Sequence, residues 1–174
     1  MFHCAGGGLG AAENNAITVI SAVVESAAFL EEQCEAYRHH KVTERRTIRL
    51  HPYSAQRTIA SDTALLGRVI GNMIKNTLEV PVVDKTVIVI CRQLTDRVEF
   101  WVHNSTFIPQ KVQQQMFKRS YSTKGKHRGL GTYSIKLLCE RYLEGSVSFT
   151  TSEQEGTTFR VSLPMIISAL KSEI

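Results

Sequence analysis

Helical and strand patterns alternate along this chain, and their interleaving limits the folds that it can adopt. Helices are expected at residues 22–40, 62–78, 109–116 and 130–143. Asp62 is a suitable N-cap for the second of these helices, and Pro81 follows its end. Strands are expected at 17–19, 47–50, 85–92, 97–102, 146–151 and 157–163. The pattern predicts an α/β fold, a two-layer sandwich in which helices cover one face of a mixed sheet.

Length and composition indicate one domain. With 174 residues, of which 43% are hydrophobic, the chain can bury the core of a single domain of roughly 100 to 150 residues. We expect a leader at 1–21, the domain at 22–164 and a C-terminal tail at 165–174. No apolar run approaches the ~20 residues that cross a bilayer, and residues 1–21 lack the basic-then-apolar layout expected of a secretory signal. The four cysteines are far apart, which favours reduced thiols in a cytoplasmic protein over a zinc site.

The positive charge is concentrated in one segment. From Gln110 to Cys139 there are seven Lys or Arg and no Asp or Glu, whereas acidic residues outnumber basic ones in the rest of the chain. This segment contains FKRSYSTKGKHRGLGTY at 117–133, a hydroxyl-rich loop that ends in a Gly-x-Gly turn before a helix. The first N–H groups of that helix would point at a bound anion. A polyphosphate fits this chemistry.

A cationic loop is also typical of a solvated surface or of a nucleic-acid patch. Proteins that bind single-stranded nucleic acid usually interleave aromatic residues with the cations, so that bases can stack on them. Between residues 118 and 132 the only aromatic residue is Tyr121. The segment therefore favours a small anionic ligand, and nucleic acid is the less expected partner.

The helix at 62–78 has an unusual polar side. Its apolar side carries Leu66, Val69, Ile70, Met73 and Ile74, and its polar side carries Arg68, Asn72, Lys75, Asn76 and Glu79. A polar helix side is ordinarily just solvated, but Asn is a poor helix former and solvated faces favour Glu, Lys or Arg. Asn72 and Asn76, one turn apart, suggest that their amides bind a ligand. The side-chain oxygen of Asn76 is the candidate ligand for Mg²⁺.

Five motifs occur in the order that one family shows. GNMIKNTLEV at 71–80 resembles the N box, HNSTFIP at 103–109 a degenerate G1 box, Met116-Phe117 the F box, RGLGTYSIKLL at 128–138 the G2 box, and EGTTFRVSLP at 155–164 the last strand pair. Together they resemble the catalytic, ATP-binding domain of sensor histidine kinases, within the superfamily of the Hsp90, MutL and gyrase ATPases. Over roughly residues 22–164, the resemblance implies a Bergerat-type α/β sandwich that holds ATP between the N-box helix and a lid at about 115–128.

The resemblance implies a role for each matched residue. Asn76 would hold Mg²⁺, Asn72 and Lys75 would lie near the phosphates, and Thr158 would lie behind the adenine. Asn72, Lys75 and Arg119 would serve catalysis. The lid groups over the triphosphate would be Lys118, Arg119, Ser122, Thr123 and Lys124, and the turn and helix start would be Gly129, Leu130, Gly131 and Thr132.

Two departures from the family pattern affect the expected chemistry. Hydrolysing relatives carry a Glu four residues before the metal-binding Asn, where it activates water, and this chain has Asn72 there. Because a neutral amide cannot accept that proton, efficient ATP hydrolysis is not expected. Phosphoryl transfer to a separate nucleophile stays possible, since positioning and charge neutralisation supply most of its catalysis. Glu79 replaces a Lys of the family, so contact with the γ-phosphate would come from Lys75 or the lid.

The G1 box departs further. Members of the family have an Asp whose carboxylate accepts a hydrogen bond from the adenine amino group. An ungapped alignment puts His103 at that position, with Ser105 and Phe107 at the two Gly positions, whereas one deletion puts Asn104 at the Asp. The side-chain oxygen of Asn104 can accept the same bond without charge. We favour Asn104 and expect weaker but still adenine-selective binding.

The phosphoacceptor is the remaining part of the expected reaction. In the family it is a His on a helical hairpin upstream of this domain, and the residues before Ala22 are too few for that hairpin. The expected function is therefore transfer of the ATP γ-phosphoryl group to a His on another segment or chain, with a response regulator as the downstream partner. The alternatives are a regulatory nucleotide-binding module without kinase activity, an anti-sigma-type Ser/Thr kinase and a nucleic-acid binder.

Overall fold

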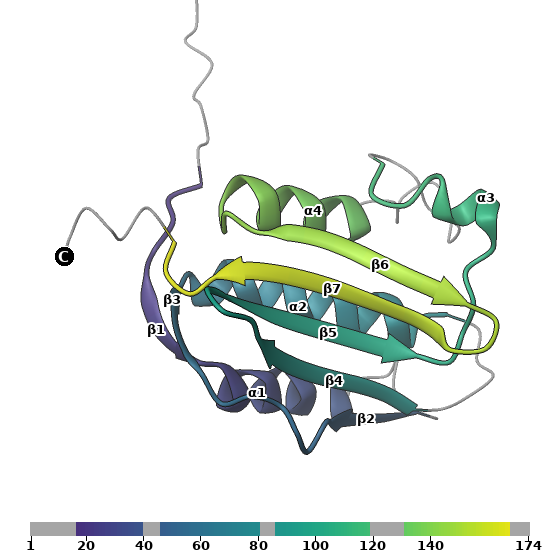
Figure 1. Ribbon diagram of the computed structural model, residues 1–174, viewed down its shortest axis with the longest axis horizontal. Helices are drawn as coiled ribbons and strands as arrows, with labels where there is room; N and C mark the ends of the chain where they lie inside the picture. The colour runs from purple at the N-terminus through teal and green to yellow at the C-terminus, as the bar shows by residue number, and fades with distance from the viewer. Residues whose placement is uncertain (1–16, 40–45, 81–85, 119–130, 168–174) are drawn as a thin grey trace, which may run out of the picture.

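Five strands form the main sheet, in the order β2-β4-β5-β7-β6 (Figure 1). The computed structural model describes residues 17–39, 46–80, 86–118 and 131–167. The strands are β2 (Thr47–Leu50), β4 (Thr86–Gln93), β5 (Arg97–Asn104), β6 (Ser146–Ser152) and β7 (Gly156–Pro164). β2 runs parallel to β4, and the other neighbouring pairs are antiparallel. The expected mixed sheet is confirmed.

Helices form the second layer. They are α1 (Ser26–Arg38), α2 (Thr63–Leu78) and α4 (Gly131–Arg141), and the short α3 (Gln110–Gln113) lies beyond one end of the sheet. In Figure 1 the sheet lies in front of α1 and α2, so the view looks onto the face that these helices leave open. The two-layer α/β sandwich is therefore confirmed. None of the helices in the described ranges has the length and apolar character needed to cross a membrane.

The strict alternation of β5 assigns its residues to the two faces of the sheet. Val98, Phe100, Val102 and Asn104 are buried on the helix side, whereas the residues between them point to the open side. The ring of Phe100 packs edge-on against Phe29 of α1, with 6.5 Å between the ring centroids. The expected apolar side of α2, including Met73 and Ile74, is fully buried against this face.

Asp62 begins α2 as the sequence predicts. Its Oδ1 atom accepts a hydrogen bond from the backbone N–H of Leu65 at 2.9 Å, so it satisfies one of the free amides of the first turn. Its Oδ2 atom accepts a second bond from the backbone N–H of Ile20, at 2.6 Å. The Asp62 side chain therefore also connects the backbone at Ile20, before β1, to the start of α2.

The N-terminal part of the domain differs from the expectation. Residues Ala22–Glu25 form a strand, β1, and not the start of a helix, and no strand forms at 17–19. β1 pairs antiparallel with β3 (Thr58–Ser61), a strand that the sequence analysis did not predict. Val23 fits helical spacing, which explains the error, but its side chain is 74% exposed in β1. α1 begins only at Ser26, whose Oγ atom donates to the backbone oxygen of Ala55.

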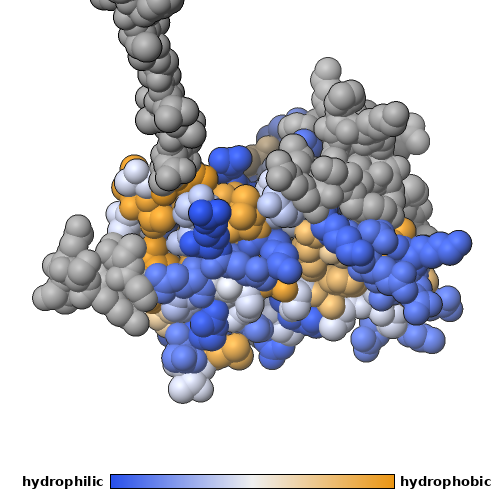
Figure 2. Space-filling model, turned by 90° about the horizontal axis from the view of Figure 1, so that it is seen from above, coloured by the Kyte–Doolittle hydropathy of each residue, from blue (hydrophilic) through white to orange (hydrophobic). Residues whose placement is uncertain are grey.

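The chain also packs beyond Pro164, where we expected a tail. The backbone N–H of Ala60 donates to the oxygen of Met165 at 2.8 Å, and the N–H of Ile167 donates to the oxygen of Ala60 at 3.3 Å. Ile167 is fully buried. Large apolar side chains of these parts of the chain are exposed, namely Ile17, Ile20, Val23 and Ile166. Figure 2 shows orange, hydrophobic surface on one side of the molecule.

Candidate functional site

The end of β5 lies against the second half of α2, which brings the G1-like segment to the N-box helix. Asn104 is the last residue of β5 and is only 7% exposed. Its Nδ2 group donates to the backbone oxygen of Thr77 in α2, at 3.4 Å. Its Oδ1 atom accepts from the backbone N–H of Thr106, at 3.2 Å, which closes a local turn of the Asx type. The motifs at 71–80 and 103–109 are therefore direct neighbours.

Threonine hydroxyls hold the residues that follow Asn104. Thr157 pairs with Asn104 across β5 and β7 and is 2% exposed. Its hydroxyl donates to the backbone oxygen of Thr106 at 2.6 Å, so the hydroxyl of Thr151, 2.7 Å away, must donate to Thr157. Thr151 in turn accepts from the backbone N–H of Ile108 at 3.0 Å. The G1-like loop is thus fixed onto the ends of β6 and β7.

Gly156 allows this close approach. Its φ angle is 75°, in the left-handed region, and a Cβ atom at this position would clash with the backbone oxygen of Asn104 and come within 2.5 Å of the Cα atom of Ser105. No other residue type fits at the start of β7 without moving the G1-like segment.

Thr158 and His103 lie on the opposite face of the sheet. The two residues pair across β5 and β7, and the Oγ1 atom of Thr158 lies 2.9 Å from the Nδ1 atom of His103. The structure therefore does not bring Thr158 together with Asn104, because neighbouring residues of a strand point to opposite faces. Thr157 is the residue that the sequence analysis missed. The alternation leading to buried Phe159 and Val161 was the signal that could have identified it.

Asn76 faces α4, so the N box meets the G2 box. Gly131 is the first residue of α4, and a Cβ atom there would lie 2.9 Å from Oδ1 and 3.2 Å from Nδ2 of Asn76. Glycine therefore leaves the space that the Asn76 amide fills. Nδ2 of Asn76 is buried without a hydrogen-bond partner within the described ranges, and so is the hydroxyl of Ser105 in the G1-like loop.

These groups suit a magnesium–phosphate ligand. An uncharged amide oxygen is a ligand that Mg²⁺ accepts, and an unused amide N–H can donate to a phosphate oxygen. Buried polar groups are normally paired, so the two unpaired groups in these motifs have hydrogen-bonding capacity left for a ligand. The residues present therefore fit the nucleotide and metal that the motifs imply.

The other predicted phosphate contacts are only partly described. Asn72 is half-buried one turn before Asn76, Lys75 is exposed on α2, and Thr132 is half-buried in the first turn of α4. Lys118 is exposed at the end of its described range. The remaining predicted lid and turn residues lie outside the described residues: Arg119, Ser122, Thr123, Lys124, Gly129 and Leu130.

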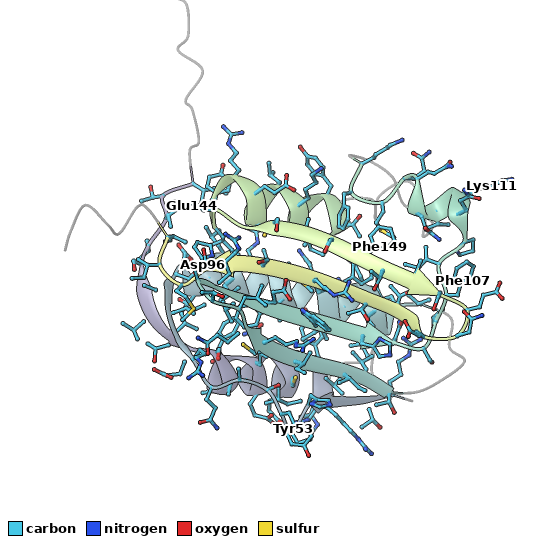
Figure 3. The ribbon with its side chains drawn as sticks, viewed as in Figure 1. Tyr53, Asp96, Phe107, Lys111, Glu144 and Phe149 are labelled. Carbon is cyan, nitrogen blue, oxygen red and sulfur yellow. The ribbon has the colours of Figure 1, made fainter. Side chains whose placement is uncertain are left out.

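The residue that precedes the predicted lid cations is anchored by aromatic packing. Phe117 of the F box has a φ angle of 65°, which is unusual for a residue other than Gly or Asn. Its ring lies 5.9 Å from that of Phe149 on β6, labelled in Figure 3, and the ring of Phe149 lies 5.9 Å from that of Phe159 on β7. This packing offsets the backbone strain and fixes where Lys118 leaves the core.

A separate groove lies between α1 and α2. It encloses ≈ 500 Å³ and is lined by Gln33 and Tyr37 of α1 and by Thr63, Ala64, Gly67, Arg68, Gly71 and Asn72 of α2. Asn76, Asn104 and Thr157 are not among its lining residues, so we do not assign it to the nucleotide. Asn72 lies between this groove and the side of α2 that carries Asn76.

Comparison with known proteins agrees with the site. The model of the histidine kinase-, DNA gyrase B- and HSP90-like ATPase family matches residues 61–167, more than half of the chain. The chain belongs to this family. The match begins just before the Asp62 cap and ends at Ile167, so this ATPase-family segment includes both asparagines of α2 and Asn104.

One curated relative of this ATPase-family chain is the probable C4-dicarboxylate sensor kinase of Halalkalibacterium halodurans. The two are 33% identical over 102 residues, which cover 55% of this chain and 19% of that protein. The chain thus spans about a fifth of its curated relative.

Solved histidine kinases share the fold. The Acinetobacter baumannii histidine kinase AdeS superposes with a TM-score of 0.71 at 13% identity, over 88% of this chain and 71% of that one. ShkA, crystallised as the full-length protein in complex with AMPPNP, superposes with a TM-score of 0.71 at 22% identity, over 86% of this chain and 32% of that one. The fold is therefore that of an ATP-binding catalytic domain of the histidine kinase type.

Proposed function

We propose that this domain binds Mg²⁺-ATP and transfers the γ-phosphoryl group to a histidine on a separate segment or chain, as the catalytic part of a two-component sensor kinase in the cytoplasm. The observation that carries the proposal is the position of Asn76. Its amide fills the space left by Gly131 at the junction of the N and G2 boxes and keeps a buried N–H without a partner in the described part of the chain.

Each group would contribute through position and charge. Asn76 would hold Mg²⁺ through Oδ1, and the metal, when bound, neutralises charge on the triphosphate. Asn72 and Lys75 of α2 and Thr132 of α4 would face the phosphates, together with Gly129, Leu130 and Gly131 of the turn. The lid groups Lys118, Arg119, Ser122, Thr123 and Lys124 would cover them. Asn104 and Thr157 would orient the adenine.

The chemistry fits a transferase better than a hydrolase. Asn72 occupies the position from which the hydrolysing relatives activate water, and an amide cannot act as a general base. An imidazole of the acceptor brings its own nucleophilic nitrogen and does not need that base. A response regulator would then be the downstream partner of the phosphorylated histidine.

Transfer can be tested with ATP labelled at the γ-phosphate and a histidine kinase dimerisation hairpin supplied as a separate chain. The expected result is Mg²⁺-dependent label on the hairpin that is labile to acid and stable to alkali, as phosphohistidine is, and that disappears in a hairpin with its acceptor His replaced by Gln. Acid-stable label would instead indicate a Ser or Thr acceptor, and binding of ATP without any labelling would contradict the proposal.

A second candidate is a regulatory module that binds the nucleotide without transferring phosphate. One observation favours it: both polar groups of the Asn104 amide are already engaged, with the oxygen of Thr77 and the N–H of Thr106. Adenine recognition through Asn104 would have to share or replace the Thr106 bond. In the labelling experiment, this candidate predicts ATP binding by the chain and no label on any hairpin.

A further inference from the structure

The open face of the main sheet carries arginines around the only tryptophan of the chain. Trp101 lies in the middle of β5 and points away from the helices, and Arg92 of β4 and Arg160 of β7 do so on the flanking strands. Figure 1 looks directly onto this face. We call Arg92, Trp101 and Arg160 the Arg-Trp-Arg cluster.

The cluster has a defined geometry. The guanidinium carbon of Arg160 lies 4.5 Å from the centroid of the indole ring, and that of Arg92 lies 4.7 Å from it. Both distances are well inside the range of cation–π contacts. The indole N–H donates to the Oε2 atom of Glu99 at 2.9 Å, which fixes the orientation of the ring. The arginines therefore stand on a rigid aromatic base and lose little further freedom on binding a partner.

The two guanidinium groups keep their hydrogen-bonding capacity. The ion pairs among the described residues all involve Arg38 or His39, at the C-terminal end of α1, and no described residue accepts a hydrogen bond from Arg92 or Arg160. A guanidinium stacked on a ring still presents its N–H edge outward, and that edge matches a carboxylate.

The positive charge of this face favours a partner with negative charge. Glu99 is the only acidic residue among the outward-pointing residues of β4, β5 and β7, and it already binds the indole; Arg97 adds a third arginine, bonded to Ser162. A second copy of this chain would place arginine against arginine. Nucleobases would have to displace an arginine to stack on Trp101. An acidic polypeptide meets neither obstacle.

We propose that the Arg-Trp-Arg cluster is a docking surface for an acidic polypeptide segment, with carboxylates of the partner bound by Arg92 and Arg160 above Trp101. Tryptophan and arginine are among the residue types that contribute most to protein interfaces. The surface lies on the opposite side of the sheet from α2, so binding here leaves the candidate nucleotide site open. The proposal does not depend on kinase activity.

The tryptophan makes the test direct, because its fluorescence reports on this face alone. The full 174-residue chain is titrated with a hexaglutamate peptide in low salt, without nucleotide, while the emission of Trp101 is followed. We expect a saturable change in emission that weakens as salt is added. The double variant Arg92→Gln/Arg160→Gln should bind about tenfold more weakly, as expected for the loss of two exposed charge pairs.

Arg141→Gln is the matched control, because Arg141 also lies over an aromatic ring, that of Tyr142, but in the helix layer. It should bind hexaglutamate like the parent. If the double variant unfolds, the single variant Arg92→Gln, at the exposed end of β4, gives the same comparison with a smaller effect. Absence of saturable binding, an equal loss in Arg141→Gln, or tighter binding of oligothymidylate than of hexaglutamate would each overturn the proposal, the last in favour of nucleic acid.

Discussion

The amide of Asn76 occupies the space that Gly131 leaves at the start of α4. A Cβ atom at residue 131 would lie only 2.9 Å from the Oδ1 atom of Asn76, closer than such contacts normally occur. The two residues are 55 positions apart in the chain and belong to different motifs, and α2 and α4 pack side by side through this contact. The geometry of the predicted metal ligand therefore depends on a glycine in another helix.

Replacing Gly131 by Ala should displace the Asn76 amide by a few tenths of an ångström without disrupting the core. We expect Mg²⁺-dependent ATP affinity to fall about tenfold, roughly 1.4 kcal/mol, with a small change in thermal stability. Isothermal titration with and without Mg²⁺ measures the effect. Gly67→Ala is the control, because a Cβ atom on this glycine of α2 meets only Gln33, at an ordinary 3.8 Å.

Thr157→Val and Thr158→Val should differ sharply. The first removes the buried hydroxyl that donates to Thr106, which leaves that oxygen unpaired and loosens the G1-like loop. We expect about 1–3 kcal/mol of lost stability and a fall in ATP affinity. The second removes a hydroxyl on the open face, bonded to His103, and should leave ATP affinity unchanged. Equal effects of the two changes on ATP binding would show that Thr157 has no special part in the site.

Gly156→Ala should be among the most destabilising single changes in the domain. The left-handed φ of 75° alone costs about 1–3 kcal/mol for a residue with a side chain, and the new Cβ atom would also collide with the backbone of Asn104 and Ser105. Denaturant unfolding should show a loss beyond that range. Gly67→Ala, in the interior of α2, should instead be neutral or stabilise by about 0.5–1 kcal/mol. A parent-like midpoint for Gly156→Ala would mean that β7 starts in a different conformation.

Buried thiols should make the fold sensitive to alkali. Burial, with a smaller contribution from Glu140, raises the pKa of Cys139 from 9.0 to about 12, and burial raises that of Cys34 to about 11. The folded state thus holds these protons more tightly than the unfolded state. The stabilisation is complete below pH 9 and is lost as the pH rises from there toward 11 and 12, by at most about 1.4 kcal/mol per pH unit and thiol.

The measurement for this prediction is the free energy of unfolding between pH 8 and 11, for the parent and for Cys139→Ala. The variant should start less stable but fall less steeply above pH 9. Parallel curves for the two proteins would contradict the assigned burial of this thiol.

The sequence allowed the main layer architecture to be predicted because its signals are local and strong. The Asp62 cap, the apolar side of α2 and the alternation in β5 each follow from residues close together in the chain. β1 was missed because its residues continue the helical spacing of α1, and β3 was missed because the strand with which it pairs, β1, was expected to be helical. Thr158 was chosen over Thr157 because a motif match does not say which of two adjacent threonines points inward; only the strand register decides that.

The candidate site could be predicted from the sequence for single residues, and less well for the contacts between them. Asn76 was predicted as a ligand residue from the cost of Asn in a helix, and Asn104 from its match to the G1 box after one deletion. The contact of Asn76 with Gly131, and the hydroxyl bonds that join the G1-like loop to β6 and β7, connect residues 43 to 55 positions apart, so no local sequence pattern predicts them.

The most direct test of the account is a titration with a fluorescent ATP analogue, with and without Mg²⁺, on the parent chain and on Asn76→Ala. The parent should bind more tightly when Mg²⁺ is present, and the variant should lose that dependence while keeping the parent's fold by circular dichroism. If Asn76→Ala still binds the analogue with the same dependence on Mg²⁺, the amide of Asn76 does not hold the metal, and the proposed site is contradicted.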